Sequence, residues 1–229
     1  MTDNLTIMHT KLRACRRCLE EGYRIVPGPV FSSGPEPRVM LIGQAPGITE
    51  GQVKRPFNAG SGKRLFQWLT NAGWDEEDFR ARHYMTAVTK CYPGPSSTGK
   101  GDRVPTPFEQ ALCRPWLEQE IRLVNPRLML LVGGLAIKLL YPANTRLHEI
   151  VGTATYFPPA ALAADPLNFD LTAAEILPTF DTTKDPAGRW VVPLPHPSGV
   201  SLWYNRPENQ ELVRKAIAIL SDIRAACEL

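Results

Sequence analysis

Four short apolar runs divide the chain and predict buried β-strands. They cover residues 38–43, 83–89, 127–134 and 189–199, with glycine or proline close to their ends. Short runs rich in valine, leucine and isoleucine are typical of strands that are covered on both faces. We therefore expect a mainly parallel sheet that lies between layers of helices.

The segments between these runs show the spacing of amphipathic helices. Ser61 is expected to cap a helix that ends at Ala72, followed by a glycine. Thr106 and Glu109 form a capping box around a proline at the first helical position, so another helix begins there. Pro115 is expected to interrupt or redirect this helix, which ends before the next Asn-Pro pair.

Strands that alternate with helices indicate an α/β domain. A terminal helix is expected from Pro207, whereas residues 141–188 have weak periodicity and are expected to be mostly loop. The four runs predict a four-stranded central sheet with helices on both faces, in a single domain over residues 1–229. Ligands of such folds bind beyond the carboxyl ends of the strands. The loops at one rim would be those at Gly43, Cys91, Gly133 and His196.

The composition is that of a globular protein, with 229 residues, 43% hydrophobic and 21% charged. A net charge of +3 permits nucleic acid as a partner but does not require it. No apolar run approaches the roughly 20 residues that span a bilayer, and the N-terminus lacks a signal-peptide pattern. We therefore expect a cytoplasmic protein without membrane association, in which structural disulfides are uncommon.

Five cysteines in such a compartment need another explanation. Cys15 and Cys18 form a C-x-x-C pair, and Cys91 and Cys113 follow with 21 residues between them. One close pair with two distant cysteines fits a 4Fe–4S cluster that joins separate parts of a domain, as four thiolates would. Zinc, a redox pair and reduced buried cysteines are the alternatives. Cys227 has no partner and is expected to be an apolar helix residue.

The first strand ends in the loop Gly-Gln-Ala-Pro-Gly, which carries residues 43–47. It lacks the Gly-Lys-Ser/Thr ending of a phosphate-binding loop and the glycine spacing of a dinucleotide fold. A purely structural turn is an equal alternative. If the loop binds a ligand, it offers open amides from Gln44 to Gly47 and the carboxylate of Glu50.

The last strand ends in Pro-His-Pro-Ser-Gly, where two prolines fix the direction of His196. Ser198 and Gly199 offer a hydroxyl and a bare amide that suit a phosphate. Apolar and aromatic residues with Arg206 come next and suit contact with nucleic acid, or equally a loop packed on the terminal helix.

Taken in order, these motifs resemble the uracil-DNA glycosylase superfamily, in particular its iron–sulfur families 4 and 5. The resemblance rests on "GQAPGITEGQVKRPFNAGSGKRL", "YMTAVTKCYP", "CRPWL" and "HPSG", and it extends from Cys15 to the terminal helix. It implies a three-layer α/β/α sandwich and an enzyme that flips uracil out of DNA and excises it. The implied partner is DNA containing uracil, bound by a monomer at the nucleoid of a prokaryote, without a nucleotide cofactor.

The resemblance also implies residue roles. His196 would donate a hydrogen bond to uracil O2, and Glu50 would orient water or crowd the C5 position. Phe57 would stack on the base. The uracil pocket and catalytic loop would be formed by Gln44, Ala45, Pro46, Gly47, Phe57 and Ala87. The DNA contacts would come from Lys63, Ser198, Gly199, Val200, Leu202 and Arg206, with Val200 or Leu202 filling the gap left by the base. The cluster ligands would be Cys15, Cys18, Cys91 and Cys113.

Three departures from the family pattern predict an atypical member. Gln44 stands where family 4 has Glu, and Ala87 stands where it has the Asn that reads uracil. The wide spacing of Cys91 and Cys113 predicts an enlarged loop at residues 93–105, and residues 158–188 look like an insertion.

Two other classes of protein remain as alternatives. One is a protein of the same fold that binds a lesion or an abasic site with weak or altered base specificity, which the missing Asn favours. The other is an α/β hydrolase of free nucleotides whose N-terminus is held by zinc.

Overall fold

The computed structural model of the protein describes residues 2–98, 101–199 and 202–229. Its centre is a sheet with the strand order β2-β1-β3-β6-β4-β5. The strands are β1 (Val39–Gly43), β2 (Tyr84–Ala87), β3 (Leu128–Val132), β4 (Ala154–Phe157), β5 (Glu175–Leu177) and β6 (Arg189–Leu194). The four predicted strands are the four parallel ones, β1, β2, β3 and β6.

The expectation of a four-stranded sheet is wrong, because β4 and β5 extend it to six strands in antiparallel orientation. Both strands lie in the segment expected to be mostly loop. β5 has only three residues and is largely exposed at the edge, so it lacks an apolar run. β4 is buried, but four residues among many turn formers are too few to show a period.

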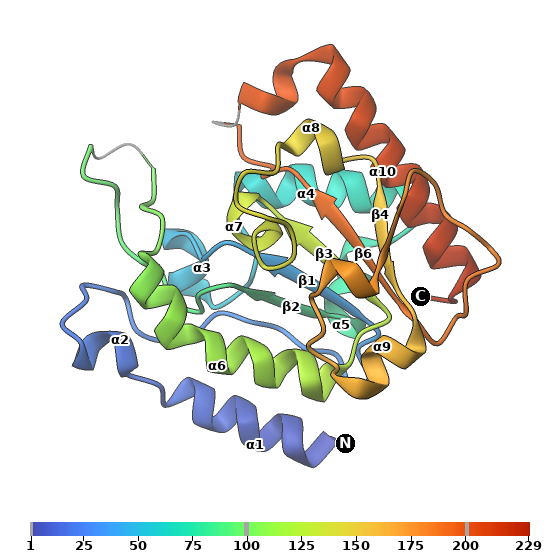
Figure 1. The fold of residues 1–229 in the computed structure, drawn as a ribbon. Coiled ribbons are helices and arrows are strands. Elements are labelled where there is room, and N and C mark those ends of the chain that lie inside the picture. Colours follow the sequence, from blue (N-terminus) through green and yellow to red (C-terminus); the bar gives the residue numbers. More distant parts are fainter. Residues whose placement is uncertain (1, 99–100, 200–201) are drawn as a thin grey trace.

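Helices cover both faces of the sheet, which confirms the predicted α/β sandwich (Figure 1). The helices are α1 (Thr2–Arg13), α2 (Arg17–Glu20), α3 (Ile48–Val53), α4 (Gly60–Asn71), α5 (Glu76–Arg82), α6 (Pro107–Val124), α7 (Gly134–Ile137), α8 (Leu147–Ile150), α9 (Pro159–Ala164) and α10 (Pro207–Ala226), with 3-10 turns η1 (Leu171–Ala173) and η2 (Leu202–Asn205). No helix of the described residues is both long enough and apolar enough to cross a bilayer.

The strand residues alternate between two hydrophobic cores. Leu41 and Leu130 face the core under α4, α5 and α10, whereas Met40 and Met129 face the core under α6 and α7. This alternation is the period of a strand, and it explains why uninterrupted apolar runs are needed here. A smaller cluster packs α1 against α6 through Leu12 and Trp116.

The helix boundaries confirm some predictions and correct others. The capping box of Thr106 and Glu109 begins α6 as expected, but α6 continues through Pro115 without interruption. Pro115 is exposed, so water can reach the carbonyl that it leaves unbonded, while buried residues on either side hold the helix on the sheet. The expected cap at Ser61 is wrong: α4 begins at Gly60, after Ala59, without a side-chain cap.

Candidate active site

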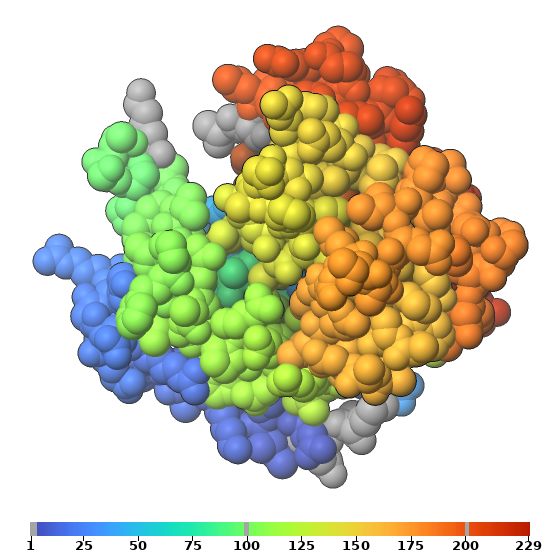
Figure 2. Space-filling view, in the orientation of Figure 1, coloured from blue at the N-terminus to red at the C-terminus, as the bar shows by residue number. Residues whose placement is uncertain are grey.

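One cavity collects most of the predicted site at the carboxyl ends of the parallel strands. Its lining includes the predicted residues Gln44, Ala45, Pro46, Gly47, Glu50, Phe57, Ala87, His196, Ser198 and Gly199. Residues 93 and 101–103 of the enlarged loop also line it. In the space-filling view the residues around this loop, in green, project from the molecule and leave an open notch beside the yellow residues of α7 and α8 (Figure 2).

Residues 43–47 place backbone, not side chains, at the cavity wall. A β-carbon on Gly47 would lie 2.6 Å from Oε2 of Glu50, so glycine is what lets this carboxylate approach the loop. Glu50 lies on α3 and is only 7% exposed, although it lines the cavity. Its carboxylate has no hydrogen bond or ion pair to the residues that the structure describes, which leaves both oxygens available to a ligand.

Phe57 is held in a constrained position beside the loop. Its backbone φ is 50°, a positive value that residues other than glycine seldom adopt. Arg80 of α5 stabilises it by donating hydrogen bonds to the carbonyls of Pro56 (2.7 Å) and Phe57 (3.0 Å). A β-carbon on Gly43 would lie 2.9 Å from Cζ of Phe57, so the ring rests on bare backbone. Arg80 is a positioning residue that the sequence analysis missed.

His196 has a defined protonation state. Burial lowers the pKa of its imidazole, so the ring is neutral near pH 7. The backbone N–H of Ser198 donates to Nδ1 over 3.2 Å, which makes Nδ1 the acceptor and places the single proton on Nε2. The neighbouring Gly133 has φ of 89°, and a β-carbon there would lie 3.1 Å from Cδ2 of His196. The site therefore presents a neutral N–H donor on a fixed ring.

Ala87 presents only a methyl group to the cavity, and a buried polar network lies behind it. The Lys90 ammonium is 2.7 Å from Oε2 of Glu120, and it donates to Oγ1 of Thr86 over 2.8 Å. Glu120 is fully buried on α6, and Tyr84 donates to it over 3.1 Å. Buried charges of this kind are stable only when they are paired and hydrogen-bonded. Spacing alone could not reveal a network that joins β2 to α6.

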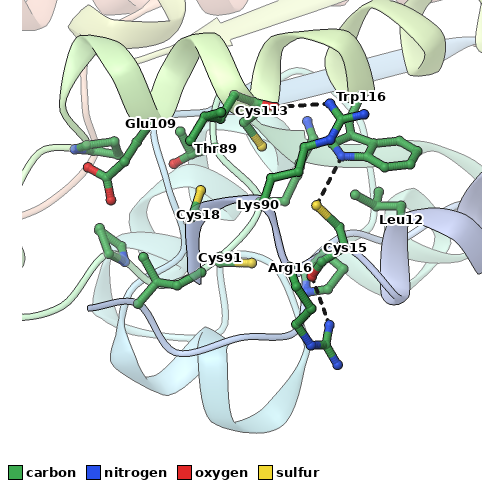
Figure 3. Close-up of a pocket in the computed structure, with 16 residues that line it drawn as sticks. Leu12, Cys15, Arg16, Cys18, Thr89, Lys90, Cys91, Glu109, Cys113 and Trp116 are labelled. Atoms are coloured by element: carbon green, nitrogen blue, oxygen red, sulfur yellow. Dashed lines mark hydrogen bonds between the residues drawn. The ribbon is translucent and has the colours of Figure 1, made fainter. Parts of the chain in front are cut away.

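The four predicted cysteine ligands line a second cavity between α1, α2, α6 and the end of β2 (Figure 3). Burial raises the pKa of Cys91 to about 11 and that of Cys113 to about 12. The indole N–H of Trp116 donates to Sγ of Cys15 over 3.2 Å. As placed, no three histidine, cysteine or carboxylate side chains among the described residues form a ready metal-binding group. Cys227 lies apart in the other core, as expected for an apolar helix residue.

The residues predicted to contact DNA lie around the cavity mouth and on η2. Leu202 is 76% exposed, and Lys63 and Arg206 are exposed near the starts of α4 and α10. Val200 lies outside the described residues. Arg64, which the sequence analysis did not select, donates to the carbonyl of Ser198 over 3.3 Å and stacks on Tyr204. Arg64 thereby ties the histidine loop and η2 to α4.

An α/β/α sandwich with a glycine-lined cavity and a neutral histidine at one strand end is the arrangement that the sequence led us to expect of a DNA glycosylase. The family model "Uracil DNA glycosylase superfamily" matches residues 31–221, and the chain belongs to this superfamily.

Curated relatives are proteins named Type-4 uracil-DNA glycosylase. The chain is 30% identical over 151 residues to that of Pyrobaculum aerophilum, which covers 65% of this chain and 70% of the relative. It is 27% identical over 180 residues to that of Sulfurisphaera tokodaii, with 70% and 76% covered. A protein of Thermotoga maritima is 33% identical over 100 residues, with 44% and 47% covered.

Proposed function

We propose that this protein excises uracil from DNA by hydrolysing the N-glycosidic bond and leaves an abasic site. The observation that carries the proposal is the neutral His196, whose Nε2–H donates into a cavity walled by backbone and an aromatic ring. Its membership of the superfamily and its Type-4 relatives support the same activity.

His196 acts on the leaving base. As the bond between C1′ of the sugar and N1 of uracil breaks, its electron pair moves onto the base and negative charge grows on O2. A neutral imidazole N–H stabilises that charge without a proton transfer. One such donor contributes about 3 kcal/mol to the transition state in comparable sites.

The other cavity residues bind and orient the flipped nucleotide. Phe57 stacks on the base, while the loop of Gln44, Ala45, Pro46 and Gly47 approaches it with backbone. Glu50 offers negative charge to the cationic sugar and orients water. Leu202, with Val200, fills the gap left in the duplex, and Lys63, Ser198, Gly199 and Arg206 bind phosphates.

Cys15, Cys18, Cys91 and Cys113 would hold a 4Fe–4S cluster. Their chemistry fits, since four thiols line one cavity and the Trp116 N–H donates a hydrogen bond to Sγ of Cys15. Burial raises the pKa of Cys91 and Cys113, and these two thiols would lose their protons on binding the cluster. A bound cluster would supply a covalent link between the segments that carry these cysteines, namely α1–α2, the segment after β2 and α6.

The activity is tested by release of free uracil from single- and double-stranded oligonucleotides. His196→Ala is expected to reduce the single-turnover rate ~100-fold with little change in DNA binding. A wild-type protein that releases no base from either strand form contradicts the proposal.

The cluster has a matched pair of variants. Wild-type protein should be brown, and Cys113→Ser should lose the broad visible absorbance together with thermal stability. Cys227→Ser removes a buried thiol outside the cavity and should keep the colour. A colourless wild type with four bound thiolates and one zinc ion would contradict the iron–sulfur assignment.

A second candidate is a protein that binds a lesion or an abasic site with altered base specificity. Ala87 favours it, because a methyl group cannot pair with the Watson–Crick edge of uracil. Tight binding to abasic DNA with negligible base release would select this candidate. Ala87→Asn would then restore uracil release.

The proposed setting follows from the substrate. We propose that the whole chain, residues 1–229, works as one domain and as a monomer without a nucleotide cofactor. We propose that it acts on chromosomal DNA in the cytoplasm, at the nucleoid of a prokaryote.

A further inference from the structure

The enlarged loop between Cys91 and α6 is a braced hairpin. The backbone N–H of Arg103 donates to the carbonyl of Gly94 over 3.0 Å. Pro95 and Asp102 are paired in an isolated antiparallel β-bridge. The Arg103 guanidinium donates two hydrogen bonds, of 2.7 and 2.6 Å, to the carboxylate of Glu109. Glu109 is 2% exposed and also caps α6. The base of the hairpin is therefore fixed to a long helix.

This hairpin brings a second carboxylate into the active-site cavity. Asp102 lines the cavity together with Glu50. A β-carbon on Gly47 would lie 2.6 Å from Oε2 of Glu50 and 3.0 Å from Oδ2 of Asp102. The two carboxylates thus converge on one point above the loop, from α3 on one side and from the hairpin on the other.

The two carboxylates differ in environment. Glu50 is buried and has no hydrogen bond or ion pair within the described part of the chain, whereas Asp102 is exposed. Asp102 lies beside the hydroxyl of Tyr92, whose pKa is raised by burial and by this carboxylate. Two carboxylates in different surroundings commonly have different roles in glycoside hydrolysis.

The strand order separates the strand end from which the hairpin leaves and the strand end that carries His196. The end of β2, from which the hairpin leaves, and the end of β6, which carries His196, are at opposite ends of the four parallel strands. A base whose oxygen meets His196 must direct its sugar to the open side of the cavity, because the DNA chain stays outside. Asp102 is exposed and so can be reached from that open side, whereas Glu50 is buried in the cavity wall.

We propose that Asp102 is a catalytic carboxylate that faces the sugar of the flipped nucleotide and stabilises its positive charge. This inference rests on the proposed glycosylase activity. The C1′–N1 bond breaks with its electron pair on the base, and Asp102 forms no bond. Water gives its oxygen to C1′ and its proton to Glu50, from which the proton reaches the base anion through solvent.

The experiment compares Asp102→Asn with Asp222→Asn. Asp102→Asn keeps size and shape but removes the charge, and Asp222 on α10 is an exposed residue whose substitution changes the net charge equally. Single-turnover release of uracil is measured with enzyme in excess, and affinity is measured with an oligonucleotide that carries a non-cleavable deoxyuridine analogue. The thermal midpoint of each variant is the control for folding.

Catalysis and binding are expected to change in different directions. Asp102→Asn should lower the single-turnover rate ~100-fold. Its affinity should be unchanged or tighter, because a charge that repels phosphate is gone. Asp222→Asn should match the wild type, and Asp102→Glu should recover part of the rate.

Two results separate the failure of this inference from failure of the proposed function. A wild type that releases no base contradicts the glycosylase activity itself. An active wild type, with Asp102→Asn within twofold of its rate and with tighter DNA binding, shows that Asp102 is surface charge only and overturns the inference.

Discussion

At the scale of single residues, the site depends on glycines that let side chains approach backbone. Because they lack a β-carbon, Gly47 lets Glu50 and Asp102 approach its backbone, Gly43 does so for the ring of Phe57, and Gly133 does so for His196. Only Gly133 among these also has a positive φ, of 89°, so both space and backbone conformation require glycine there. Replacing any of these three glycines would therefore push away a side chain that lines or supports the cavity.

Gly133→Ala should displace His196. The new methyl group would lie 3.1 Å from Cδ2 of the imidazole, and the backbone would be strained as well. We expect the single-turnover rate to fall at least ~10-fold and the free energy of unfolding to fall by about 1–2 kcal/mol.

The matched control is Gly134→Ala, where a β-carbon would meet nothing within 4 Å and φ is not positive. An unchanged rate in Gly133→Ala would show that His196 tolerates displacement, contrary to the fixed-donor mechanism.

At the scale of elements, helices hold the loops that form the cavity. α5 holds the loop of Phe57 through Arg80, α4 holds the histidine loop through Arg64, and α6 holds the hairpin through Glu109. Each contact joins a guanidinium to a carbonyl or a carboxylate, where several donors can fix a loop at once. These contacts add to the order of the three loops.

Arg80→Ala should loosen the loop that carries Phe57. Its side chain is 9% exposed and its two carbonyl contacts would be lost, so we expect the free energy of unfolding to fall by about 2 kcal/mol. KM for uracil-containing DNA should rise because the Phe57 ring, which we propose stacks on uracil, is no longer fixed.

Arg82→Ala on the same helix is the control, since Arg82 is 58% exposed and pairs only with Asp78 among the described residues. Equal effects of the two substitutions on KM would argue against a positioning role for Arg80.

At the scale of the whole molecule, buried polar groups join the layers. His9 of α1 hydrogen-bonds to Tyr84 of β2 over 2.8 Å, and Tyr84 continues to Glu120 of α6. On the other face, His83 packs between aromatic rings, and neither of its ring nitrogens has a partner among the described residues. Both histidines are neutral because burial lowers their pKa to about 4.

Acid should therefore destabilise the fold. The pKa of each histidine is about 4 in the folded state and 6.5 when unfolded, so the unfolded chain binds more protons between these values. The stabilisation is complete above pH 6.5 and is lost as the pH falls toward 4, by up to about 3 kcal/mol for each histidine. Urea unfolding at a series of pH values measures this loss.

His83→Phe should reduce that pH dependence by roughly half, since a phenyl ring fits the aromatic surroundings and does not titrate. A stability that stays level from pH 7 to pH 4.5 in the wild type would contradict the prediction.

The sequence by itself determined the parallel half of the sheet and the order of the loops at its rim. Short apolar runs rich in valine, leucine and isoleucine are typical of strands covered on both faces, and turn residues at their ends mark the loops. These local signals predicted β1, β2, β3 and β6, the capping box of α6, and the positions of Gly47, Glu50 and His196 in one cavity. The same signals failed for β5, whose three residues form a strand only because β4 lies beside them.

Only the tertiary structure decided which distant groups meet. The continuity of α6 through Pro115 depends on the core beneath it, and the pairing of Lys90 with Glu120 depends on how α6 lies on β2. The convergence of Asp102 with Glu50 depends on a hairpin braced to α6. Such contacts join residues far apart in sequence, so no local period or spacing encodes them. The parallel strands could be predicted from local sequence, whereas the position of Asp102 in the cavity depends on tertiary packing.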